Sequence, residues 1–200
     1  MLGSLRTRPQ DYVVKVTATL GKPEHHGAGL LLTQDGYFVS TYHIANDILA
    51  RKSMDTTQLH ITYDGHDYPL DPRVDITYQP AKDLFLAKAD IRGPPRPTNI
   101  KLAEPNVGEP IKLYSKPGGR NYHSTGKVLS TDCNTRTECG LLQGQMLTSA
   151  PSFKGCSGGI YADERNAIVG MVAFSSNRNS GGPKSSDIER LIDETMKKYR

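Results

Sequence analysis

Short runs of β-branched and aromatic residues, each closed by a turn with glycine or proline, recur along the chain. The run 12–20 (YVVKVTATL) alternates in the manner of a half-buried strand. Asp35-Gly36 and Asp64-Gly65 each separate two such runs, which is a strong short-range signal for a β-hairpin. The 19 glycines and 13 prolines are spread over the chain, a distribution that favours many turns over a helical bundle. The pattern therefore predicts an all-β protein.

The expected strands fall into two groups, separated by the proline-rich segment 92–98 (RGPPRPT). Because proline-rich segments are stiff, this one is the natural boundary between an N-terminal unit, residues 1–98, and a C-terminal unit, residues 99–200. We expect each unit to be a six-stranded antiparallel β-barrel. The stretch 21–29 is expected to be a turn-rich loop. Strands are expected at 12–20, 30–33, 37–40, 58–63, 67–70, 73–78 and 84–89, and then at 110–114, 124–130, 141–148, 159–161 and 167–174.

The end of the chain has a different pattern. From Ser186 to Tyr199 the apolar residues follow helical spacing, and Ser186 with Glu189 forms a capping box. We therefore expect a C-terminal amphipathic α-helix after the second barrel.

Charge and apolar patterning argue against several classes of function. The formal net charge of +4 comes from scattered Lys and Arg, which favours a solvated surface over a nucleic-acid-binding face. No stretch approaches the roughly 18 apolar residues of a membrane helix. The first ten residues lack the apolar centre of a signal peptide, so we expect an intracellular protein or a trimmed part of a longer one. Three cysteines are an odd number, which argues against a disulfide scaffold.

The segment Gly155-Cys156-Ser157-Gly158-Gly159 carries the strongest chemical signal. Acyl transfer needs a nucleophile on a tight turn, with backbone N–H groups directed at the developing oxyanion. Ser157 offers the hydroxyl, and the N–H groups of Gly155 and Ser157 are the candidate oxyanion-hole donors. Taken alone, the five residues also fit an ordinary glycine-rich turn.

Two further residues fit the same chemistry. A serine nucleophile needs a base, and His43 stands at the end of a predicted hairpin strand. The imidazole then needs a carboxylate to fix its tautomer, and Asp83 directly precedes an apolar strand. Each residue alone has an ordinary structural interpretation. The three in the order His43, Asp83, Ser157 predict a catalytic triad.

These motifs resemble those of chymotrypsin-like serine proteases, and in style those of the Deg/HtrA-type branch. The Gly-x-Gly strand, the Asp-Gly hairpin and the histidine motif of that branch match Gly27-Ala28-Gly29, Asp35-Gly36 and Tyr42-His43-Ile44. Its acid motif matches 82–88, its motif that begins with Val-Gly matches 107–118, and its nucleophile motif matches 155–171. The resemblance implies a serine endopeptidase that acts on protein or peptide substrates, without cofactor or metal, and leaves the oligomeric state open.

The resemblance also implies where the specificity pocket lies. No acid stands at its floor and no histidine at its wall, so we expect a small or medium apolar side chain rather than Lys, Arg or Gln at the cleavage site. Lys154, beside the entrance, favours an acidic neighbour. The implied pocket residues are Pro151, Ser152 and Lys154 on one side, and Val172, Ala173, Phe174 and Ser175 on the other.

Two residues depart from the family pattern. Cys156 stands where digestive relatives have the Asp that captures a freed N-terminus, so we expect activity without prior proteolysis. Ala173 stands where many relatives have a Ser that supports the catalytic Asp. Cys156 is also a conceivable nucleophile, but only Ser157 directly precedes the two glycines, and we interpret the thiol as packed and inert.

Several alternatives stay open. Cys133 and Cys139 flank a hairpin loop and are placed to pair in an oxidising compartment. A zinc site formed by them with His123 lacks a fourth ligand in the sequence. The chain also fits a protease-like binding module that has lost turnover, or a self-processing protease domain cut from a larger polyprotein.

Overall fold

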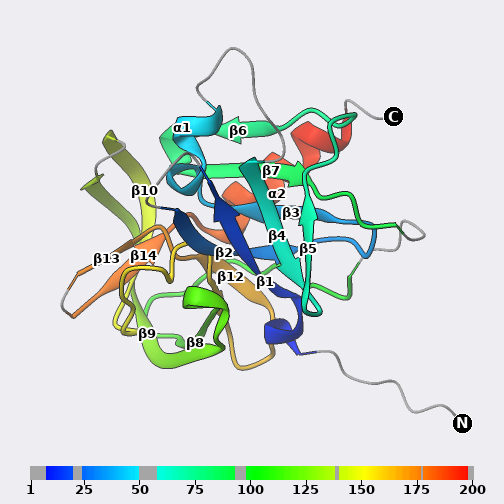
Figure 1. Cartoon of the computed structure of the whole chain (residues 1–200). Helices are drawn as coiled ribbons and strands as arrows, with labels where there is room; N and C mark the ends of the chain where they lie inside the picture. Colours follow the sequence, from blue (N-terminus) through cyan, green and yellow to red (C-terminus); the bar gives the residue numbers. More distant parts are fainter. Residues whose placement is uncertain are drawn as a thin grey trace, which may run out of the picture.

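The molecule is built around two antiparallel sheets of seven strands each (Figure 1). The computed structural model describes residues 8–19, 24–49, 58–92, 98–137, 140–176 and 178–197. The first sheet has the order β5-β4-β1-β2-β3-β7-β6, and the second has the order β12-β11-β8-β9-β10-β14-β13. The all-β fold class with two barrels and a C-terminal helix is thereby confirmed.

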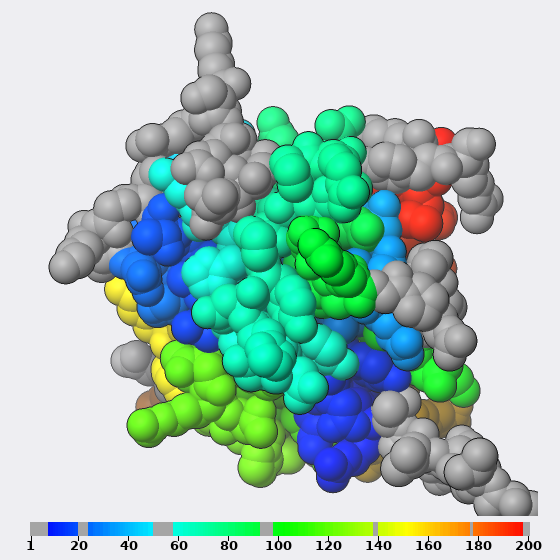
Figure 2. Space-filling view, turned by 45° about the vertical axis from the view of Figure 1, so that its right-hand side comes forward, coloured from blue at the N-terminus to red at the C-terminus, as the bar shows by residue number. Residues whose placement is uncertain are grey.

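The first sheet is built from the N-terminal half of the chain. An isolated bridge between Leu70 and Ala89, next to the ends of β5 and β7, links its two sides and closes it as a barrel. In Figure 2 the residues around β4 and β5 (cyan) cover one outer face of this barrel. The strands are β1 (Val13–Ala18), β2 (His25–Leu31), β3 (Tyr37–Ser40), β4 (Leu59–Tyr63), β5 (His66–Pro69), β6 (Thr77–Gln79) and β7 (Leu84–Lys88).

The second sheet uses the C-terminal half and is closed in a similar way, by a bridge between Gly170 and Lys184. Its longest strands, β9 and β10, form a hairpin, and β9 pairs along its first part with β8. The strands are β8 (Pro110–Ser115), β9 (Tyr122–Thr137), β10 (Gly140–Thr148), β11 (Ile160–Ala162), β12 (Ile168–Met171), β13 (Phe174–Ser175) and β14 (Ser180–Gly182).

Short helical segments connect the strands. The 3-10 turns are η1 (Pro9–Tyr12), η2 (Tyr42–Ile44), η4 (Pro80–Lys82) and η5 (Pro117–Gly119), and α1 is the single turn Asn46–Leu49. The C-terminal helix α2 (Ser185–Lys197) packs against β7 and β12. It starts one residue before the expected Ser186, and the N–H of Lys184 donates to Asp187 to close its first turn, in place of the expected Ser186–Glu189 box. Tyr199 lies outside the described residues.

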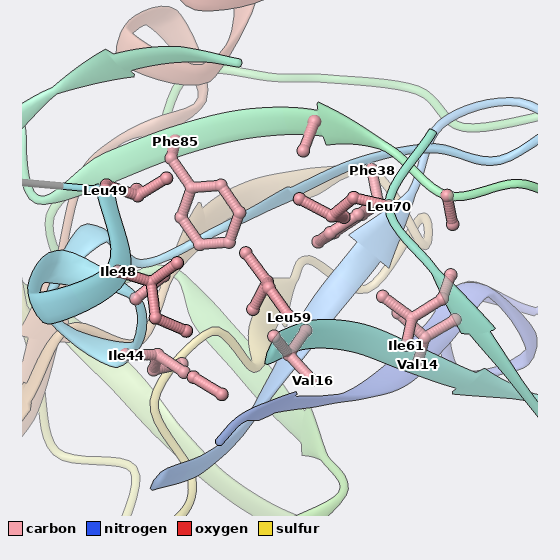
Figure 3. Close-up of a cluster of buried hydrophobic side chains, with 14 of the residues drawn as sticks. Val14, Val16, Phe38, Ile44, Ile48, Leu49, Leu59, Ile61, Leu70 and Phe85 are labelled. Carbon is pink, nitrogen blue, oxygen red and sulfur yellow. The ribbon is translucent and has the colours of Figure 1, made fainter. Parts of the chain in front are cut away.

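Strand β7 shows why the core has two parts. Side chains alternate between the faces of a strand, so Phe85 and Ala87 point into the first barrel while Leu84 and Leu86 point out of it. The inner set packs with Val16, Phe38, Ile48, Leu59 and others (Figure 3). The outer set packs against β11, β12 and α2, through Ile160, Met171, Ile188 and Leu191 among others. The contact between the two barrels is therefore apolar and continuous.

The strand boundaries differ from the prediction at several places. Residues 25–29, expected in a loop, belong to β2, where His25 to Leu30 pair with Ala18 to Val13 of β1. Residues 180–182 form the unexpected β14, and the expected strand 167–174 is divided into β12 and β13. The run 73–78 is a strand only at Thr77–Gln79, because the chain turns ahead of it: the N–H of Val74 donates to the carbonyl of Asp71, and the N–H of Arg73 donates to Asp71 Oδ1. Each sheet has seven strands, and barrels of six were expected: the seven runs predicted in the first half all contribute a strand, and the five predicted in the second half become seven.

Two absences concern the described residues only. None of their helices is long and apolar enough to cross a membrane. None of their His, Cys, Asp and Glu side chains gather in threes in a way that could hold a metal ion.

Candidate active site

His43 and Asp83 form a hydrogen-bonded pair within the first barrel. The Nδ1–H of His43 donates to Asp83 Oδ2 at 2.6 Å, and the backbone N–H of His43 donates to Asp83 Oδ1 at 2.8 Å. Asp83 is 1% exposed, whereas the His43 side chain is 29% exposed. Since an ionised carboxylate only accepts hydrogen bonds, the pair fixes the tautomer with the proton on Nδ1 and the lone pair on Nε2.

The pairing of β3 with β7 explains why these two residues meet. Ser40 lies opposite Phe85 in this register, so the residues that follow β3 lie beside those that precede β7. Asp83 has a left-handed backbone, with φ of 56°, at the end of η4, and its carbonyl accepts the N–H of Tyr42 at 3.0 Å. The acid therefore lies on a sharp turn that is hydrogen-bonded to the turn bearing the histidine.

Asp83 has no support from the second sheet. Within the described residues its carboxylate accepts hydrogen bonds from His43 alone. Ala173 stands at the position where the resembling proteases have a Ser that supports the acid. It is buried, and its N–H donates to the carbonyl of Gly181. The alignment of the acid therefore depends on the backbone and ring of His43.

The segment that carries Ser157 is a tight turn. The N–H of Cys156 donates to the carbonyl of Phe153 at 3.0 Å, and Gly155 has φ of 98° at the third position of the turn. A positive φ at this position is typical of a type II turn and favours glycine. In the part of the chain that the structure describes, the N–H groups of Gly155 and Ser157 donate to no other protein group. Both donors are therefore available to a ligand.

The same segment packs onto the first barrel. The carbonyl of Ser157 accepts the N–H of Ala28 on β2 at 2.7 Å. A side chain at Gly158 would strike the carbonyl of Ala28 and come within 2.7 Å of Ser40 Oγ. At Gly27 a side chain would meet Ile44 and the carbonyl of Ser157, the latter at 2.8 Å. Ser157 and Ile44, the residue that follows His43, therefore both border Gly27.

The residues of the expected specificity pocket lie on two neighbouring segments. Pro151 and Ser152 precede the turn and Lys154 is its second residue, and Ser152 Oγ is buried without a partner among the described residues. Val172 and Ala173 are buried between β12 and β13. Phe174 and Ser175 form β13, which pairs with Gly181 and Ser180 of β14. That these residues bind a substrate side chain stays a prediction.

Sequence reasoning missed two residues of β9, Tyr122 and Ser124, that bond to the segment just before this turn. Their hydroxyl groups donate to the carbonyl of Pro151, at 3.0 and 2.7 Å. No local signal marks them, because the contact depends on which strands pair. Cys133 is a free, partly buried thiol, and Cys139 lies outside the described residues, so their pairing stays open.

The chain is similar in structure to the protease Rv3671c of M. tuberculosis. With its active form the TM-score is 0.72 at 13% identity, over 94% of this chain and 82% of that chain. With an inactive form, a serine-to-alanine mutant, the TM-score is 0.69 at 14% identity, over 94% of this chain and 88% of that chain. No protein-family model matches the chain, and no curated protein sequence matches it significantly. At this level of identity the likeness concerns the fold: the chain has the two-barrel fold of the chymotrypsin-like serine proteases.

Proposed function

We propose that this protein is a serine endopeptidase in which Ser157 is the nucleophile, His43 the general base and Asp83 the residue that orients the base. The observation that carries this proposal is the buried Asp83 carboxylate bonded to His43 Nδ1, which leaves Nε2 as a proton acceptor. The glycine turn with two unengaged N–H groups supports it, and so does the likeness in fold to a protease.

The chemistry that follows has two halves. Ser157 Oγ attacks the carbonyl carbon of the scissile peptide, and its proton passes to His43 Nε2. The N–H groups of Gly155 and Ser157 stabilise the oxyanion that forms. The C–N bond then breaks, the amine leaves with the proton from Nε2, and an acyl ester remains on Ser157. Water hydrolyses this ester by the same proton transfers in reverse.

The proposed substrate is an extended peptide with a small or medium apolar residue before the scissile bond. The apolar, buried Val172 and Ala173 support this preference, as does the lack of an acid at Pro151. Lys154 is exposed at the second position of the turn and would favour an acidic neighbouring residue. We keep the division into residues 1–98 and 99–200, since the strands of the first sheet lie within 13–88 and those of the second within 110–182.

Covalent labelling tests the proposal directly. The protein is incubated with a fluorophosphonate probe, its intact mass is measured, and the labelled residue is mapped; digestion of denatured casein is followed in parallel. We expect one adduct per chain, on Ser157, with loss of fluoride, and no adduct in Ser157→Ala or in heat-unfolded protein. Cys156→Ala is the matched control and should be labelled normally. An adduct on another residue, or neither adduct nor cleavage, would overturn the proposal, and the latter result would favour a binding module.

A further inference from the structure

The turn before the candidate nucleophile needs an anchor, because glycine at its third position permits two forms. In a type II turn the central peptide, between Lys154 and Gly155, has the opposite orientation to that in a type I turn. The reversal would remove the Gly155 N–H from the oxyanion site. Glycine tolerates both backbone conformations at little cost, so neighbouring groups decide which one is populated.

A charged anchor is not present next to the nucleophile. Cys156 occupies that position, is fully buried, and its thiol has a pKa raised by burial. Among the described residues, its main-chain partners are the carbonyl of Phe153, the Oγ of Ser115, which donates to the Cys156 carbonyl at 3.1 Å, and the N–H of Gly159. The anchor therefore has to come from groups other than the side chain at position 156.

The β8–β9 hairpin supplies such groups at both ends of the turn. Upstream, the carbonyl of Pro151 accepts two hydrogen bonds, from Tyr122 Oη–H and Ser124 Oγ–H, at 3.0 and 2.7 Å. The ring of Tyr122 also meets the ring of Phe153, the first residue of the turn, edge to face with centroids 4.9 Å apart. This is a favourable geometry for two aromatic rings.

Downstream, Pro117 of η5 lies against Gly155. A Cβ placed on Gly155 would be 3.4 Å from Pro117 Cβ and 3.7 Å from its Cα, so Pro117 borders the space beside Gly155. The turn η5 itself packs against β1 and β2 of the first barrel, which gives it a rigid backing. The glycine turn is therefore enclosed by residues of one hairpin.

We propose that Tyr122 and Ser124, with Pro117 behind Gly155, are positioning residues that hold the oxyanion turn in its type II form, in place of an ion pair beside the nucleophile. This inference rests on the proposed function, because it takes the Gly155 N–H of this turn to be a donor to the oxyanion. Activation would then depend on the fold of the second barrel rather than on a new terminal amine.

Two conservative variants test the upstream anchor. Tyr122→Phe removes one hydroxyl and keeps the ring on Phe153, and Ser124→Ala removes the other. The matched controls are Ser130→Ala, further along β9, and Tyr68→Phe on β5 of the first barrel. The readouts are the second-order rate of fluorophosphonate labelling of Ser157, amide hydrogen exchange of the peptide 149–158, and the thermal midpoint.

We expect each single variant to be labelled about fivefold more slowly, in line with the loss of one neutral hydrogen bond, and the double variant more than tenfold. Exchange in 149–158 should accelerate while the thermal midpoint moves by only a few degrees, and the controls should match the wild type. A merely structural role would lower the midpoint and leave the labelling rate of the folded protein unchanged.

Wild-type labelling and exchange in both single variants would overturn the inference, even if the double variant failed to fold. If the wild-type protein is not labelled at all, the proposed function fails, and exchange in 149–158 alone then decides whether the two hydroxyls anchor the turn.

Discussion

The backbone N–H of Ala28 donates a 2.7 Å hydrogen bond to the carbonyl of Ser157 and thereby joins the nucleophile turn to the sheet that bears His43 and Asp83. The next residue, Gly158, has φ of 79° and donates its own N–H to the carbonyl of Val172, which directly follows β12 of the second sheet. Two consecutive residues thus bond to different barrels. The relative placement of base and nucleophile depends on how closely the chain can approach β2 at this point.

Gly158→Ala should therefore be strongly destabilising and inactivating. The added methyl group would overlap the carbonyl of Ala28, and the left-handed backbone adds strain. We expect a loss of unfolding free energy of about 3 kcal/mol or more. Gly65→Ala is the matched control, since φ is 77° there but no atom lies within 4 Å of the new Cβ, and it should cost only about 1 kcal/mol. Urea unfolding of the two variants makes the comparison; equal losses would mean that the packing of Gly158 on β2 is unimportant.

Asp83→Asn should preserve the fold and nearly abolish turnover. The amide can donate to the ring of His43 and so favours the tautomer with the proton on Nε2, which cannot act as the base. By analogy with the trypsin-type triad, for which this substitution is a known example, turnover should fall on the order of 10⁴-fold. Steady-state hydrolysis of a cleaved peptide measures the loss, and Asp75→Asn, an exposed acid eight residues earlier, is the control. Near-normal turnover in Asp83→Asn would assign the acid to another residue.

The candidate triad could be predicted from the sequence because each of its residues lies beside a strand with a clear pattern. His43 follows an Asp-Gly hairpin, Asp83 precedes an apolar run, and Ser157 stands among glycines. Strand periodicity and turn-forming residues are local features, so they can be recognised in the sequence without a structure.

What escaped prediction has a common physical cause. In β2 and β14 glycine is required by close packing rather than by a turn: Gly27 borders Ile44 and Ser157, and Gly181 lies under the ring of Phe174. A glycine-rich strand of this kind has the composition of a loop. The contact of Tyr122 with Pro151 joins residues 29 positions apart, so it depends on strand register, which local patterns do not encode.

The stability of the first barrel should depend on the ionisation of Asp71. Hydrogen bonds from the Arg73 side chain are the main reason that the pKa of this buried carboxyl falls from 3.8 to about 2. A carboxyl whose pKa is lower in the folded state stabilises the protein above its unfolded pKa, and this contribution is lost as the pH falls from about 4 to about 2. Chemical unfolding of the wild type at pH 6 and pH 3 should show the loss.

Asp71→Asn should be less stable than the wild type at pH 6 and should lose less stability on acidification. Asp132→Asn, at an exposed position on β9, serves as the control and should follow the wild type at both pH values. Parallel losses in wild type and Asp71→Asn between pH 6 and pH 3 would show that the Asp71–Arg73 pair contributes nothing to acid sensitivity.

Cys156 should be dispensable for turnover, although it is adjacent to the nucleophile. Its side chain is fully buried in the core of the second barrel with Val128, Met146 and Tyr161, and burial raises the pKa of the thiol, so it is neither an exposed thiolate nor a charge partner. We expect Cys156→Ala to keep turnover within about threefold, with a small loss of stability from the cavity. Cys156→Asp should fail to fold well, because it buries a carboxylate without a partner.

The same absence of a charged group predicts that the protein acts without proteolytic activation. No carboxylate at position 156 can bind a new terminal amine, and the turn at Gly155 is already held by Pro117, Tyr122 and Ser124. The uncleaved chain, verified by its intact mass, should therefore label with a fluorophosphonate probe at the same rate as a variant that begins at Arg8. Labelling that arises only after removal of the first residues would show that a terminal amine, or release of a blocking segment, controls the turn, and that the uncharged anchor is not sufficient.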